Sequence, residues 1–167
     1  MSKWFVVLLI WFLTSISSGV FAQEELRANH HLFLDLGGPG GFGSLNYEQQ
    51  WHIDSSTSIG ARLGLSTYTL TDFTARFNPD IILPFTVSYL YGNDHILEAG
   101  AGMSMASIVA AGNDFTPQRG YRYYGNITLG YRYQKTGNSL VYRVGYSPLY
   151  SFEEYFHWAF ISIGYAF

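Results

Sequence analysis

The sequence contains no cysteine, which excludes a disulfide framework, a thiolate metal site, a cysteine nucleophile and a lipid-anchored cysteine. Charged residues are also scarce: they make up 13% of the chain, about half of the ~25% that is usual in soluble domains. The chain has nine basic and twelve acidic residues, and its formal net charge is -3. Nucleic-acid binding requires a basic face, so we expect no nucleic-acid partner.

Long apolar runs are missing too, except near the N-terminus. Residues 4–13 form an apolar run that follows Lys3, and small residues at Val20 and Ala22 come soon after it. A helix of ten residues spans about 15 Å of a ~30 Å hydrocarbon core, too little for a transmembrane helix. Basic, apolar and small residues in this order are typical of a cleaved export signal. We therefore predict a signal peptide at 1–22 and one domain at 23–167.

Alternation of apolar and polar residues is the main pattern in the predicted domain. A period of two is typical of half-buried β-strands, and no sustained helical stripe accompanies it. Eight alternating segments are found, at about 31–38, 43–51, 57–68, 80–91, 95–107, 120–134, 139–148 and 156–167.

The links between these segments alternate in length. After the first glycine-rich link, short links near 52–56, 92–94 and 135–138 alternate with longer ones near 69–79, 108–119 and 149–155. Short turns at one end and long loops at the other are typical of bacterial outer-membrane barrels. We predict an all-β fold: an eight-stranded antiparallel up-and-down transmembrane β-barrel, with short periplasmic turns and longer extracellular loops. It would lie among the lipids of the outer membrane of a Gram-negative bacterium.

A soluble barrel of the lipocalin kind shows the same alternation, but with its apolar face inside. Composition decides between the two, because the charged residues of the strands all lie on the small, polar face and are too few to cover a soluble exterior. These residues are Asp35, Glu48, Arg62, Glu98, Arg122, Arg132 and Arg143. An unpaired charge inside a narrow barrel would be costly. We therefore predict an arginine–carboxylate network that fills the lumen.

The last segment carries a family resemblance. Ile161, Ile163, Tyr165 and Phe167 share one face of this segment, and the sequence stops at Phe167. A terminal Phe preceded by apolar residues at every second position resembles the C-terminal signal of outer-membrane barrels, and the resemblance implies recognition by the barrel-assembly machinery. The strand count and loop pattern resemble the small eight-stranded group that includes the OmpA transmembrane domain and OmpX. The resemblance implies no enzymatic activity.

Two other patterns in the sequence could indicate a binding or catalytic site. Residues 38–43 match G-x-G-x-x-G, but a dinucleotide site needs a following helix, and here a strand follows; a tight hairpin is expected instead. His157 lies close to Glu153 and Glu154 in sequence, and a carboxylate could orient this histidine as a base. The histidines are too scattered for a metal site, and we expect no metal and no cofactor.

The function predicted from these patterns is a non-enzymatic outer-membrane protein with a structural or loop-display role. An extracellular ligand would bind through the loops 69–79, 108–119 and 149–155. Two alternatives stay open: a narrow channel for small solutes, and a lipid-modifying hydrolase built around His157.

Overall fold

A computed structural model describes residues 28–112, 114–135, 139–151 and 154–167. The predicted export signal, 1–22, and Glu153 lie outside the described residues. Within these ranges the structure holds no helix that is both long and apolar enough to cross a membrane.

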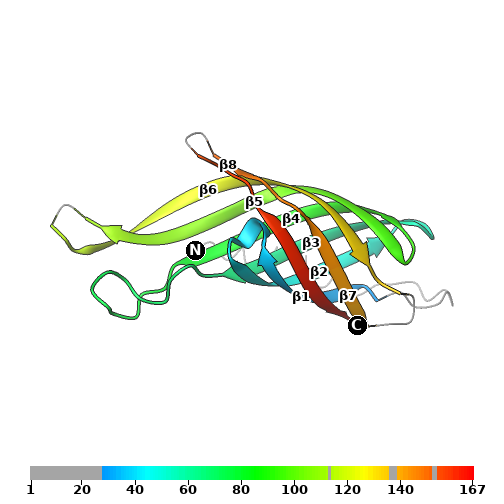
Figure 1. Ribbon diagram of the computed structural model, residues 1–167, viewed down its shortest axis with the longest axis horizontal. Coiled ribbons are helices and arrows are strands. Elements are labelled where there is room, and N and C mark those ends of the chain that lie inside the picture. The colour runs from blue at the N-terminus through cyan, green and yellow to red at the C-terminus, as the bar shows by residue number, and fades with distance from the viewer. Residues whose placement is uncertain (1–27, 113, 136–138, 152–153) are drawn as a thin grey trace, which may run out of the picture.

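The described chain is built almost wholly from antiparallel strands (Figure 1). These are β1 (His30–Gly37), β2 (Gly43–His52), β3 (Thr57–Ser66), β4 (Ile81–Gly92), β5 (His95–Ala111), β6 (Pro117–Tyr133), β7 (Leu140–Tyr146), β8 (Leu149–Tyr150), β9 (Tyr155–Phe156) and β10 (Ala159–Ala166).

Neighbouring strands pair in sequence order from β1 to β7, and the pairing of β1 with β10 closes the sheet into a barrel. The short β8 follows β7 along the edge of β6, and β9 pairs with β8 just before β10 begins. The wall therefore consists of eight strands, two of which are interrupted, at 147–148 and at 157–158. This closed barrel confirms the predicted fold class.

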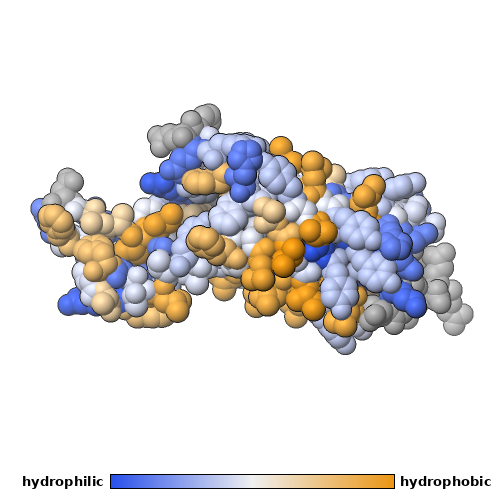
Figure 2. Space-filling view, viewed as in Figure 1, coloured by the Kyte–Doolittle hydropathy of each residue, from blue (hydrophilic) through white to orange (hydrophobic). Residues whose placement is uncertain are grey.

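The two faces of the wall have opposite chemistry. In β2, Asn46 and Glu48 are buried in the lumen, whereas Leu45 and Tyr47, which alternate with them, are exposed. The same alternation runs through the other strands, so large apolar side chains cover much of the exterior (Figure 2). An apolar exterior around a polar interior is the arrangement of a membrane barrel and the inverse of a soluble one.

Two strands are longer than the sequence pattern indicates. β5 and β6 have 17 residues each, and their pairing continues as far as Ala111 and Pro117. Most of the predicted link 108–119 is therefore strand, since β5 ends at Ala111 and β6 begins at Pro117. The extended β5–β6 hairpin projects past the barrel at the end where the long loops lie (Figure 1).

The glycine-rich link between β1 and β2 folds into the barrel mouth. Its 3-10 turn, Gly38–Gly40, is buried. The Ser104 hydroxyl of β5 donates to the Pro39 carbonyl at 2.8 Å, and the Ser66 hydroxyl donates to the Gly40 carbonyl at 2.8 Å. A tight hairpin is present, as expected, but its inward fold depends on these distant strands.

Placing a charge on the exterior tests which face meets lipid. Leu63 is 57% exposed near the middle of β3. The substitution Leu63→Arg should lower the unfolding free energy of the protein by about 2–4 kcal/mol, because the charge then enters hydrocarbon. Denaturant unfolding in lipid vesicles measures this loss. The control Ile53→Arg, in the β2–β3 turn, should cost about 0–1 kcal/mol. Equal costs would contradict the assignment.

Candidate functional site

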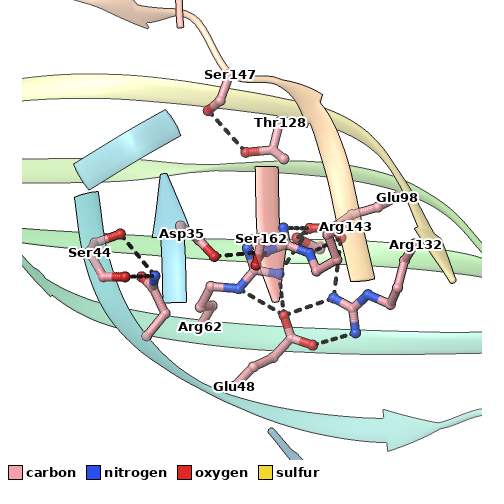
Figure 3. A network of polar contacts seen from close by, with 12 residues as sticks. Asp35, Ser44, Glu48, Arg62, Glu98, Thr128, Arg132, Arg143, Ser147 and Ser162 are labelled. Carbon is pink, nitrogen blue, oxygen red and sulfur yellow. Dashed lines mark hydrogen bonds and ion pairs between the residues drawn. The ribbon is translucent and has the colours of Figure 1, made fainter. Parts of the chain in front are cut away.

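A layer of six charged side chains crosses the lumen (Figure 3). Alternate inward-facing positions of β1, β2, β3, β5, β6 and β7 supply one residue each. In that order they are Asp35, Glu48, Arg62, Glu98, Arg132 and Arg143. All six are buried, and Glu48 and Arg132 have no exposed surface at all.

Glu48 is the acceptor at one side of this layer. Arg132 donates to its two carboxylate oxygens from both terminal guanidinium nitrogens, at 2.8 and 3.1 Å. Arg62 donates from Nε at 2.9 Å and also from Nη2, and the Gln50 amide adds a bond at 2.6 Å. Paired, charge-assisted bonds of this kind are the strong ones.

Glu98 links the same arginines to the opposite wall. It accepts from Arg62 Nη2 at 3.0 Å and from Arg132 Nη2 at 3.2 Å. Arg143 donates to it from Nε at 3.0 Å and from Nη2 at 2.8 Å, and its Nη1 lies 3.5 Å from Asp35 Oδ1. The six charges thus form one connected network rather than isolated pairs.

An aromatic ring stands at the centre of the arginines. The guanidinium carbons of Arg62, Arg132 and Arg143 lie 5.1, 5.2 and 4.9 Å from the centroid of the buried Phe33 ring. The negative face of a ring attracts a cation, most strongly where water is excluded. Gly164 on β10 makes room for this ring, since a Cβ there would collide with it.

The charges in this layer balance, three arginines against three carboxylates. Taking an ion out of water costs several kcal/mol unless a partner compensates it, and here each member has one or more oppositely charged partners. The layer can therefore be buried as a neutral unit. Chemically it is a set of salt bridges across one level of the lumen, in which every member is paired.

Arg122 was predicted to belong to this network, and that placement is wrong. Its side chain is exposed and pairs with Glu154 at 3.0 Å. Arg122 has the same parity as Arg132 on β6, but it lies beyond Gly125, the last residue of β6 that pairs with β8. With no paired strand on that side of β6, a residue of inward parity meets solvent.

A buried histidine beside the network was missed. His31 precedes Phe33 and Asp35 at inward positions of β1, is fully buried, and stacks on the Phe33 ring with a 4° angle between the planes. Neither of its ring nitrogens has a hydrogen-bond partner, and neither does Arg132 Nε. Buried water commonly satisfies such groups. The alternation of β1 could have placed His31 in the lumen.

Of the described residues that a hydrolase site would use, Glu154 and His157 do not pair with each other. Glu154 accepts hydrogen bonds from Arg122 and Tyr124. His157 instead pairs with the Tyr146 hydroxyl and packs edge-on against Tyr155. Among the described residues, no group of three or more His, Asp or Glu side chains could hold a metal ion.

The four residues that resemble an assembly signal lie on the outer surface of the last strand. Ile161, Ile163, Tyr165 and Phe167 are all exposed, and the Phe167 ring stacks on His30 at 5.8 Å. They are therefore accessible from outside the barrel.

No protein-family model and no curated protein sequence matches the chain. Solved structures that are similar to it include two outer-membrane barrels. The N-terminal β-barrel domain of OprF from Pseudomonas aeruginosa has a TM-score of 0.58 at 14% identity, over 85% of this chain and 100% of that one. The outer membrane protein Ail from Yersinia pestis has a TM-score of 0.54 at 7% identity, over 84% and 100%. These identities establish the fold alone, that of small outer-membrane barrels, and confirm the predicted resemblance.

Removing one charge should expose the cost of an unbalanced network. Glu98→Gln leaves three buried arginines with two carboxylates, and we expect a loss of about 3–5 kcal/mol of unfolding free energy. The double variant Glu98→Gln with Arg143→Met restores the charge balance and should lose less. Denaturant unfolding of the refolded protein measures both.

The control for that experiment is the exposed pair of Arg122 and Glu154. Arg122→Gln should cost less than about 1 kcal/mol, because solvent screens such pairs. A cost for Glu98→Gln that is as small as that of this control would contradict the network's role in stability.

Proposed function

We propose that this chain is a non-enzymatic, non-conducting β-barrel of the outer membrane that holds a rigid lobe outside the cell. The lobe consists of the loop 67–80 and the β5–β6 hairpin beyond residue 106. The closed lumen beneath a structured projection is the observation that carries this proposal.

Two barriers in series support the absence of conduction. The charged layer occupies one level, and the buried turn of residues 38–40 occupies another, nearer to the mouth. Eight strands leave an interior just wide enough for side chains to fill. A solute would have to displace both barriers.

Bonds between its two parts support a rigid lobe. Arg119 of the hairpin donates to the Asn78 side chain at 2.6 Å and to the Pro79 carbonyl at 3.1 Å. The buried Asp80 carboxylate accepts from the Val109 amide at 2.9 Å and from the Thr69 hydroxyl at 3.0 Å. The loop and the hairpin are therefore held together, as a surface for recognition requires.

Planar-bilayer recordings test the closed lumen. The unmodified protein should show no conductance steps. Glu48→Ala with Arg132→Ala removes the largest contacts of the charged layer and should yield small steps, because water and ions can then enter. Steps from the unmodified protein equal to those from this variant would favour the channel alternative.

The hydrolase alternative predicts a change in lipid A mass when the protein is overproduced. We expect unchanged lipid A, because among the described residues His157 contacts Tyr146 and Tyr155 rather than the Glu154 carboxylate. A mass change that His157→Ala abolishes would overturn the non-enzymatic assignment.

The proposed assembly signal, Ile161, Ile163, Tyr165 and Phe167, has a separate test. Deleting Phe167 should lower the amount of folded protein in the outer membrane far more than a change at the lobe, such as Phe115→Ser, because the barrel-assembly machinery would read the last strand. Heat-modifiability on gels reports the folded fraction. Normal levels after the deletion would count against this role.

A further inference from the structure

The two tips of the lobe share one backbone turn. In the loop, the Asp72 amide donates to the Arg76 carbonyl, and the Ala75 amide donates to the Asp72 carbonyl. In the hairpin, the Gly112 amide donates to the Thr116 carbonyl, and the Phe115 amide donates to the Gly112 carbonyl. The turns 72–76 and 112–116 are therefore equivalent, and each tip carries the triplet Asp-Phe-Thr, at 72–74 and at 114–116.

Each turn places a non-glycine residue in the left-handed region. Ala75 has a φ of 60° and Phe115 a φ of 52°. Glycine is favoured at this position of a three-residue hairpin loop because it has no Cβ to strain the backbone. A bulky aromatic residue with positive φ is a true outlier. Such strain persists where the surrounding structure enforces it, often at functional sites.

The tips also expose large apolar side chains. Phe73, Phe77 and Phe115 are 52%, 79% and 82% exposed. Figure 2 shows hydrophobic residues over both tips, at the end of the molecule away from the C-terminus (Figure 1). The Asp72 carboxylate accepts hydrogen bonds within its own turn. These bonds, above all the one from the Thr74 hydroxyl, hold the pKa of Asp72 below its usual value. Exposed apolar patches on an ordered support mark interaction sites.

The charges on the tips suggest the occupant. Arg76 and Asp114 are exposed, and neither side chain has an ion pair or hydrogen bond within the described part of the chain. They lie on different tips, so each lobe presents one available cation and one available anion. In a two-fold contact, residue i of one copy meets residue j of the other and the reverse. Two lobes facing each other can therefore place each Arg76 against the other copy's Asp114.

We propose that the lobe binds the lobe of a second copy of this chain in a facing membrane, with the phenylalanines at the centre and the two Arg76–Asp114 pairs at the edge. This inference rests on the proposed extracellular display of the lobe. With ~200 Å² for each whole aromatic side chain, the exposed fractions of the three phenylalanines amount to roughly 400 Å² of apolar surface. That is about half of the ~800 Å² per partner of a stable interface. A single contact is thus weak, and many copies on two surfaces give avidity.

Vesicle clustering tests the proposal. Refolded protein in phosphatidylcholine vesicles should cluster them, as light scattering reports. Arg76→Asp makes both of the available charges negative, Asp114→Arg makes both of them positive, and each variant alone should lose clustering. A mixture of the two vesicle types should regain it, since unlike lobes then meet. Lack of clustering by the unmodified protein, or by the mixture, would overturn the proposal.

Two further measurements separate this contact from other causes. The absence of native cysteine lets Ala111→Cys report, by labelling, that the lobe faces outward in every sample. Protein-free vesicles should not join the clusters; if they do, the occupant is lipid and the proposal fails. Phe115→Asn suits the left-handed position, so it should keep the denaturation midpoint or raise it while clustering is lost. Bilayer recordings remain silent in all of these variants unless the proposed closed lumen is itself wrong.

Discussion

The burial of six charges around Phe33 is the constraint on which the barrel depends. Six of the eight wall strands each contribute one member, so the network forms only when all six strands are in register. A shift of one residue in any strand would turn its charge toward the exterior and an apolar side chain into the lumen. Glu98 alone contacts Arg62, Arg132 and Arg143. A closed barrel with a shifted strand would leave an ion unpaired, and the cost of that ion therefore favours the one register in which all six charges are paired.

The same constraint explains how much could be predicted from the sequence. Alternation determines on which face a residue lies, and this was enough to bring Glu48, Arg62 and Glu98 together. It does not determine height along the barrel axis, and Arg122 shows the difference: its parity is inward, but the pairing of β6 with β8 has ended before it. The wall ends at the height where β5 and β6 still pair with each other but no longer pair with their outer neighbours. Local sequence patterns do not contain this information, because it depends on strands that are distant in sequence.

The inward turn is a second case of non-local control. The residues of 38–41 favour a tight turn, and Gly37, Gly38 and Gly41 adopt positive φ, as glycine allows. The direction of the turn is set by the Ser104 hydroxyl, 65 positions away from Pro39 in sequence. Such a bond exists only once the barrel has closed. The barrel thus positions the turn inside its own mouth, through contacts that no short segment can form alone.

Beyond the barrel, lipid no longer supports the strands and the lobe must be held by its own bonds, those of Arg119 and Asp80. In this region the residue types that adopt positive φ differ from those in the rest of the described chain. Glycine takes positive φ at Gly37, Gly38, Gly41 and Gly92, and among the described residues only Ala75 and Phe115 take it without being glycine. Both of these stand at equivalent positions in the two tips. A chain that uses glycine freely elsewhere keeps a phenylalanine at the strained position 115, which is the choice expected if this side chain makes the proposed contact.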